Sequence, residues 1–214
     1  MSSLVAVPTK PSAYTSLRAA ALPLAALCLA FFVEMVDNTL LSIALPTIGR
    51  SLDSGTAGLQ WVTGAYSLTF GGLLLLAGSA ADRFGRRRVL LAGLAAFGLI
   101  SLAVVFVTDI GHLIALRALL GAAAAAMAPV TMSLIFRLFD DEKLRMRSIT
   151  IVMIVGMSGF VLGPILGGTV LSHFSWQWLL VVNAPIALIA WIGVRAGVQA
   201  DRRADLTSER LDLP

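Results

Sequence analysis

The chain has 214 residues, of which 58% are hydrophobic and 13% are charged, whereas a typical soluble domain has about 25% charged residues. Its mean hydropathy is +0.90, which excludes an ordinary soluble domain, and its single cysteine, Cys28, excludes an internal disulfide. The net charge is +4, but the basic residues lie in short gaps between apolar runs. A nucleic-acid-binding protein would cluster them on one solvated surface. We therefore expect a lipid bilayer as the environment and no nucleic-acid partner.

Six apolar runs follow one another along the chain, joined by gaps too short to hold a soluble domain. Each is long enough to cross a bilayer core of about 30 Å, which needs roughly 20 residues. The alternation of a β-strand is absent, so we expect an all-α membrane protein. The expected spans are Ala21–Pro46, Trp61–Ala81, Val89–Val107, Ile110–Phe136, Ile149–Leu171 and Trp178–Val194. The expected domains are 1–18, an amino-terminal segment; 19–200, a transmembrane domain; and 201–214, a carboxy-terminal segment that looks truncated.

Lys and Arg are retained preferentially in cytoplasmic loops. If the amino terminus is inside, fourteen of the 16 basic residues fall on the cytoplasmic side. Arg50 alone lies outside, and Arg117 lies within a span. We therefore expect a multi-pass protein of the inner (plasma) membrane with both termini cytoplasmic, and with Trp61, Trp176 and Trp178 at the outer interface, a level that aromatic residues favour.

The loop after the second span contains Gly78, Asp82, Arg83, Gly85, Arg86 and Arg87 in a fixed spacing. This pattern resembles the cytoplasmic loop signature of the major facilitator superfamily, whose fold has two six-helix halves, each a 3+3 inverted repeat. The resemblance implies that Asp82 and the arginines form a charge lock that holds the cytoplasmic side closed. Physically, Gly78 permits close helix approach and Gly85 permits a tight turn with positive φ. The alternative is a simple turn with topogenic positive charge.

The fourth span carries Arg117 within Leu116-Arg117-Ala-Leu-Leu-Gly121, similar to a second signature of that superfamily. A charge inside a membrane is rare and usually faces a cavity or a partner, so Arg117 is a functional candidate. The alternative is an arginine whose side chain reaches the outer surface.

The fifth span contains Gly159, Gly163, Pro164, Gly167 and Gly168 in a pattern that resembles the antiporter signature of the superfamily. Small residues four apart permit close contact between helix backbones, and Pro164 removes a helical hydrogen bond. An ordinary glycine-rich packing face is the alternative. In a chain without a second half, this face would be left toward lipid, so we expect instability or oligomerisation.

The first span ends in Asp37-Asn-Thr39-Leu-Leu-Ser-Ile-Ala-Leu-Pro46, and the second span opens with Gln60-Trp61 and leads to Tyr66. These segments, with Trp178 to Pro185, resemble the fourteen-helix drug/proton antiporter subfamily and cover nearly the whole chain. The resemblance implies proton-coupled efflux of lipophilic or cationic small molecules, with protons and a small-molecule substrate as partners. No nucleotide loop, catalytic triad or metal-ligand spacing is present, so we expect no cofactor, no metal and no enzyme activity.

Loss of water in the bilayer favours the neutral form of a carboxyl group, which suits Asp37 to proton transfer. Glu34 lies three residues earlier, on nearly the same helix face; it is either a second coupling or cation-binding group or a partner for a neighbouring helix. Counting residues places Asp37 and Arg117 at a similar depth. Our hypothesis is that they exchange partners as the proton moves, with Tyr66, Phe32 and Met35 near the substrate, although such residues more often serve packing.

Three interpretations therefore remain open. The chain is the amino-terminal half of an antiporter, a half-transporter that assembles with itself or with a second half, or a membrane fragment that does not transport.

Overall fold

The computed structural model describes residues 14–201, which are helical almost throughout and contain no strand. The expectations for residues 1–13 and 202–214 lie outside the described part. The helices are α1 (Ala21–Ser51), α2 (Thr56–Phe84), α3 (Arg86–Ala103), η1 (Val104–Phe106), α4 (Ile110–Leu138), α5 (Glu142–His173), α6 (Gln177–Val181) and α7 (Asn183–Gly197).

Six helical stretches in the described part are long and apolar enough to cross a membrane, which confirms the expected number of spans. The sixth is divided into α6 and α7 at Val182, although Val182 keeps helical angles of φ −55° and ψ −26°. Pro185 has no N–H to donate to the carbonyl of Val181, one helical turn earlier. One helical hydrogen bond is therefore missing next to the interruption, and Asn183 is the first residue of α7.

Several helices are longer than the apolar runs within them. α1 continues past Pro46 to Ser51, and α5 begins at Glu142 instead of Ile149. A helix remains favourable beyond the hydrocarbon where its first N–H groups find acceptors. Asp141 provides one at the start of α5, where its carboxylate accepts from the Leu144 N–H at 2.8 Å. Hydropathy therefore located each helix but underestimated the helix length, because the polar ends of the helices lie outside the apolar runs.

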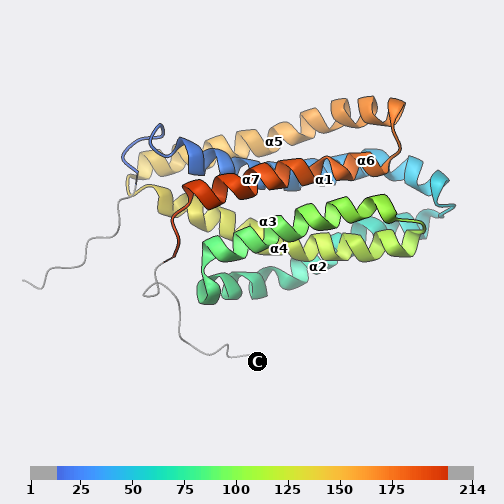
Figure 1. Ribbon diagram of the computed structural model, residues 1–214, viewed down its shortest axis with the longest axis horizontal. Helices are drawn as coiled ribbons and strands as arrows, with labels where there is room; N and C mark the ends of the chain where they lie inside the picture. The colour runs from blue at the N-terminus through green and yellow to red at the C-terminus, as the bar shows by residue number, and fades with distance from the viewer. Residues whose placement is uncertain (1–13, 202–214) are drawn as a thin grey trace, which may run out of the picture.

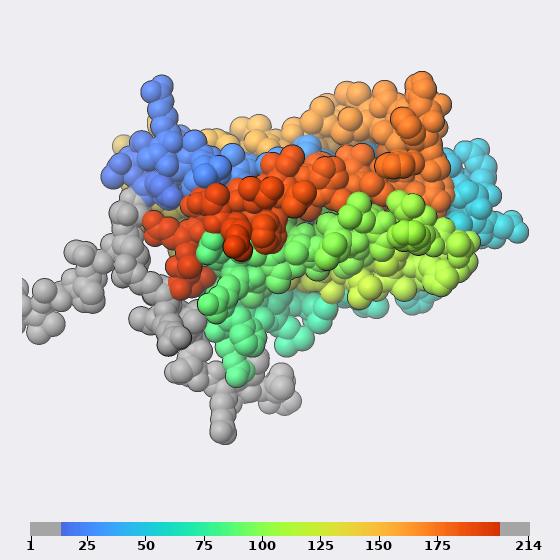
Figure 2. All heavy atoms as spheres, in the orientation of Figure 1, coloured from blue at the N-terminus to red at the C-terminus, as the bar shows by residue number. Residues whose placement is uncertain are grey.

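The helices pack in the order α5, α1, α7, α3, α4 and α2, and α1 also contacts α4 (Figure 1). The contacts are symmetric between the two halves of the chain. If α1 is exchanged with α4, α2 with α5, and α3 with α6–α7, each pair of neighbouring helices becomes another pair of neighbours. This is the packing expected of two three-helix repeats. On the face in Figure 2, α7 (red) lies between the first part of α1 (blue) and α3 (green).

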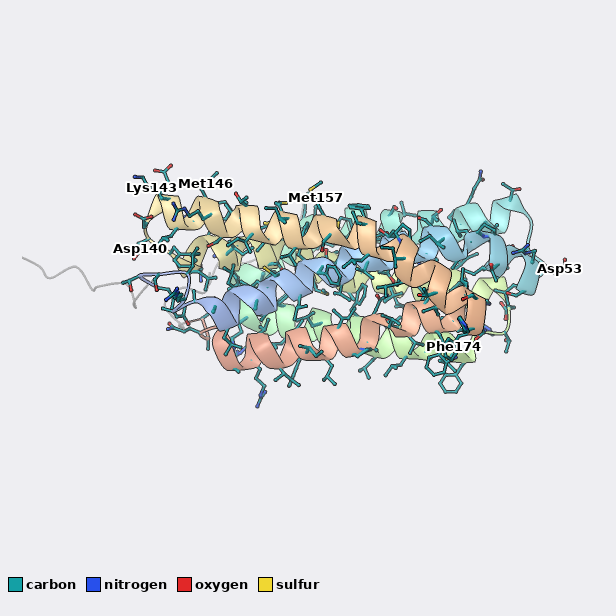
Figure 3. All side chains as sticks on the ribbon, turned by 90° about the horizontal axis from the view of Figure 1, so that it is seen from above. Asp53, Asp140, Lys143, Met146, Met157 and Phe174 are labelled. Atoms are coloured by element: carbon teal, nitrogen blue, oxygen red, sulfur yellow. The ribbon has the colours of Figure 1, made fainter. Side chains whose placement is uncertain are left out.

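α1 and α4 form the interior of the bundle, while α2 and α5 lie at its edges. The most apolar stretch of α1 is 61% buried and that of α4 is 56% buried, against 17% for α2 and 22% for α5. In Figure 3 the side chains of Met146 and Met157 point away from the bundle on α5. The broad exposed faces of α2 and α5 are therefore available to lipid or to further protein.

The ends of the bundle differ in composition. Asp140 and Lys143 lie at one end, and Asp53 and Phe174 lie at the other (Figure 3). Trp61 and Trp178 are exposed near this second end, but Trp176 is only 3% exposed. Trp176 instead packs in an apolar cluster with Val104, Leu179 and neighbouring residues. The Trp176 side chain therefore turns inward and fills the core, and its level in a bilayer stays a prediction.

The glycine-rich face of α5 packs on α1. A Cβ on Gly156 would collide with Phe31, and one on Gly163 would collide with Thr39. Gly159 lies against Met35 and Val36, and Gly167 lies against Ile43. The expectation that this face would be left toward lipid is therefore wrong, because its partner is α1 of the same chain.

Candidate functional site

A buried ion pair joins α1 to α4 at the centre of the bundle. Arg117 Nη1 donates to Asp37 Oδ2 at 2.6 Å, and the two side chains are 1% and 0% exposed. α1 and α4 are equivalent helices of the two repeats, so the pair connects one repeat to the other. Arg117 is therefore turned toward a carboxylate inside the protein and does not reach the outer surface.

The second oxygen of Asp37 is held from a third helix. Asn183, at the first position of α7, donates from Nδ2 to Asp37 Oδ1 at 2.7 Å. Asn183 is fully buried. Both oxygens of the Asp37 carboxyl group therefore have donors, one charged and one neutral, which compensates for their removal from water.

The guanidinium of Arg117 also lies over an aromatic ring. Its Cζ is 4.4 Å from the centroid of Tyr66 on α2, a cation–π contact. The ring of Tyr66 stacks on Phe70 at a centroid distance of 6.1 Å. Tyr66 is thereby fixed beneath the arginine, while Phe32 and Met35 on α1 are only partly buried.

Close packing of α2 and α4 produces this contact. A Cβ on Gly121 would collide with the Tyr66 carbonyl and the Thr69 hydroxyl. Thr69 Oγ1 donates to the Ala118 carbonyl at 2.8 Å. The glycine that follows Arg117 by one turn therefore lets α4 come close enough to α2 for the guanidinium to reach Tyr66.

Glu34 lies one helical turn before Asp37 and is only 3% exposed. Among residues 14–201, its Oε1 has no hydrogen-bond partner. Two other buried atoms near Asp37, Arg117 Nε and Asn183 Oδ1, also lack partners in this part of the chain. The site thus combines an ion pair with a second carboxyl group that is buried and forms no ion pair among the described residues.

The loop after α2 consists of a single residue, Gly85. Its φ of +99° lies in the region that glycine adopts readily, as the sequence predicted. Asp82 and Arg86, on either side of it, form an ion pair at 2.8 Å. Arg83 lies over the ring of Phe84, with its Cζ 5.6 Å from the centroid. A Cβ on Gly78 would meet no atom of the described residues within 4 Å, so the expected close helix approach does not occur with this part of the chain.

Asp201 binds the start of α3 and the end of α4 together. Its Oδ2 accepts from the Arg87 backbone N–H at 3.0 Å, and its Oδ1 accepts from Arg137 Nη1 at 3.0 Å. The Asp201 side chain is 8% exposed. A negative charge at a helix amino terminus satisfies free N–H groups and interacts favourably with the helix dipole. Asp201 therefore connects the segment after α7 to the start of α3 and to the end of α4.

The remaining residues of the fifth-span motif are divided between two environments. Gly159, Gly163 and Gly167 are buried against α1, whereas a Cβ on Gly168 would meet nothing within 4 Å. α5 runs without interruption through Pro164. The motif therefore builds the α1–α5 contact that supports the segment carrying Asp37.

Comparison with known proteins agrees with this architecture. The family model of the Major Facilitator Superfamily matches residues 27–210. The chain belongs to the Major Facilitator Superfamily.

Among curated relatives in this superfamily, a puromycin resistance protein of Streptomyces alboniger is 43% identical over 180 residues, which are 84% of this chain and 35% of that protein. A cephamycin export protein of Amycolatopsis lactamdurans is 39% identical over 201 residues, 94% of this chain and 41% of that protein. A multidrug efflux pump of Mycolicibacterium smegmatis is 39% identical over 165 residues, 77% of this chain and 33% of that protein. The chain thus spans between a third and about two fifths of the length of these relatives.

The sequence analysis did not identify Asn183 and Asp201 as site residues of this superfamily member. The sequence places Asn183 only within a family-like segment, and it places Asp201 in a terminal segment. The available signal for Asn183 is an amide two residues before Pro185 in an apolar span. Asn183 lies 146 residues from its partner Asp37. Asp201 lies 64 residues from Arg137 and 114 residues from Arg87. No local sequence pattern specifies contacts over such separations.

Proposed function

We propose that the chain is the amino-terminal six-helix portion of a proton-coupled exporter of lipophilic or cationic small molecules. The names of its relatives, which refer to puromycin resistance, cephamycin export and multidrug efflux, support this class of activity. On this proposal, residues 19–200 form the membrane domain, both termini are cytoplasmic, and the protein moves solutes without enzymatic chemistry.

The observation that carries the proposal is the buried ion pair of Asp37 and Arg117. In the interior of a membrane protein, an ionisable group is expensive and usually marks an ion or substrate pathway. When Asp37 takes a proton, its attraction to Arg117 falls, and among residues 14–201 the guanidinium keeps the ring of Tyr66 as a close partner. Breaking such a pair changes the free energy by about 3–5 kcal/mol, enough to shift a two-state equilibrium.

The loop at Gly85 would act as the gate of this transporter. Asp82, Arg83, Arg86 and Arg87 are at the end of the bundle that also holds Asp201, and the Asp82–Arg86 pair is only partly buried. Its partners therefore remain accessible to a second set of helices. We propose that Gly78, which leaves an open surface on α2, allows such a helix to approach.

The second candidate is a half-transporter that joins another copy or a separate partner chain. It is favoured by the low burial of α2 and α5, whose most apolar stretches are 17% and 22% buried. Both candidates use the same ion pair, and they differ in which protein completes the pathway.

The test is efflux of ethidium from cells that lack their own pumps and express this 214-residue chain, with and without an uncoupler. Uncoupler-sensitive efflux by the chain alone supports assembly from identical copies. No efflux despite confirmed insertion, but efflux with the remaining helices co-expressed, supports the amino-terminal portion. Insertion without efflux under either condition would contradict a transport function.

A further inference from the structure

Two exposed arginines lie where α3 begins and α7 ends. The two helices pack against each other on the face in Figure 2, and at this end the side chain of Arg87 donates to the Arg195 carbonyl at 2.5 Å. Arg195 is exposed, and so is Arg88, the residue that follows Arg87. The transport mechanism proposed above uses neither Arg88 nor Arg195.

The acidic side chains at this end of the bundle do not neutralise the two arginines. Asp82 and Asp201 pair with other arginines, at 2.8 and 3.0 Å. Within residues 14–201, Arg88 and Arg195 take part in none of the ion pairs. The ends of α3 and α7 therefore carry two positive charges that an external anion can neutralise.

The guanidinium of Arg195 lies against an aromatic ring. Its Cζ is 5.4 Å from the centroid of Trp191, one helical turn earlier on α7. Trp191 is itself partly buried against the core. Tryptophan is enriched where the hydrocarbon of a bilayer meets the headgroups. The Trp191 ring thus holds a positive charge close to the surface of α7, at the level where lipid phosphates lie.

An apolar strip continues from this point along the outer surface of both helices. Leu188 and Ile192 on α7 and Leu99 on α3 are largely exposed, and Ala92 and Ala95 on α3 are exposed as well. Inorganic phosphate or a nucleic acid gains nothing from such a strip. The acyl chains of a phospholipid do, because they bury apolar surface against it.

We propose that Arg88, Trp191, Arg195 and Ile192 bind one anionic phospholipid, with its phosphate on the two guanidinium groups and its acyl chains along the apolar strip. Arginine suits this role, because its planar fork of N–H groups matches two phosphate oxygens and is weakly hydrated. A phosphatidylcholine headgroup carries its own cation and gains less from two arginines. The inference requires only that the chain lies in a bilayer, so it is tested without transport.

The first test is native mass spectrometry of the purified 214-residue chain, titrated with phosphatidylglycerol or phosphatidylcholine in detergent. We expect one tightly bound phosphatidylglycerol. The double variant Arg88→Gln with Arg195→Gln should bind it about twentyfold more weakly, because each arginine near an anionic lipid surface contributes roughly fivefold. Equal affinity of the wild type for the two lipids overturns the proposal.

Lys143→Gln with Arg147→Gln is the matched control. It removes the same number of positive charges from exposed residues of α5, and Lys143 lies at one end of the bundle with Asp140, near the end of α4 (Figure 3). This variant should bind phosphatidylglycerol as the wild type does. Equal weakening in both double variants would mean attraction by net charge alone, and it overturns the site.

A third variant separates loss of charge from loss of folding. Arg88→Lys with Arg195→Lys keeps both charges and should bind phosphatidylglycerol more tightly than the double glutamine variant. Equal binding by the lysine and glutamine variants contradicts a role for the two charges.

The second test locates the lipid and distinguishes it from a free anion. Replacing Trp61, Trp176 and Trp178 with Phe leaves Trp191 as the only fluorescent tryptophan of the chain. Phosphatidylglycerol with brominated acyl chains should quench Trp191 more strongly than brominated phosphatidylcholine at the same mole fraction, and inorganic phosphate should not reverse the quenching. Equal quenching by the two lipids, or reversal by phosphate, overturns the proposal of a lipid site.

Discussion

Asn183 and Asp37 lie 146 residues apart in sequence, yet the amide of one donates to the carboxylate of the other at 2.7 Å. This bond links the first residue of α7 to the middle of α1. It adds a third helix to the contact between α1 and α4, so that the carboxyl group of Asp37 is held from two directions. Asn183 is therefore a positioning residue for Asp37.

Replacing Asn183 with Ala should leave Asp37 Oδ1 without its donor and destabilise the fold by about 1–3 kcal/mol, the cost of an unsatisfied buried group. Melting of the purified chain in detergent measures this loss. Gln60→Ala is the control, because Gln60 is an exposed amide near the start of α2. An equal loss in both variants would contradict a specific role for Asn183.

Removing one member of the central ion pair should harm stability more than removing both. Arg117→Gln leaves Asp37 as an uncompensated buried charge, and the expected cost is about 3–5 kcal/mol. The double variant Asp37→Asn with Arg117→Gln contains no buried charge at these two positions and should recover most of that stability. It should still lack proton-coupled efflux. Additive losses in melting experiments would show that the two residues are energetically independent.

Gly163 and Gly168 provide a matched pair of substitutions on one helix. Gly163→Val should collide with Thr39 and separate α5 from α1, whereas Gly168→Val enters open space. Overpacking usually costs about 1–3 kcal/mol, so we expect the melting temperature to fall for the first variant alone. A similar fall for Gly168→Val would indicate that valine in the helix, and not the contact with α1, is responsible.

Asp201→Ala should release the first turn of α3, because it removes the acceptor of the Arg87 N–H. Hydrogen exchange measured by mass spectrometry should become faster in residues 86–90. Asp140→Ala, which changes an exposed aspartate near the end of α4, should leave that exchange unchanged. Slow exchange in both variants would mean that Asp201 does not hold this turn.

The amino-terminal end of α4 should show a pH dependence through Asp109. Its carboxylate accepts from the His112 N–H at 3.0 Å, and this hydrogen bond lowers the pKa of Asp109 below its ordinary value of 3.8. A lowered pKa gives stability that is present above about pH 4 and is lost as the pH falls further. Asp109→Asn should therefore melt below the wild type at pH 7 and approach it at pH 3. A constant difference between the two pH values would contradict this origin.

Hydropathy was sufficient to predict the six spans, because a bilayer restricts what a chain can form, and the family resemblance implied the repeat architecture. The depths of Asp37 and Arg117 could also be compared by counting residues along each helix. Sequence alone did not identify the partner of the glycine face on α5, because spacing indicates a close contact but not the helix that makes it. The inward turn of Trp176 and the contacts of Asn183 and Asp201 likewise depend on how distant helices assemble.

The single-residue connection at Gly85 has a mechanical consequence. A longer loop would absorb a tilt of α2, but one residue leaves no slack between Phe84 and Arg86. Asp201 extends this rigid joint to the end of α4 through Arg137. Displacement of α2 by an approaching helix would therefore be transmitted as torque to α3 and α4 together, and through α4 to the buried Arg117 in the interior of the bundle.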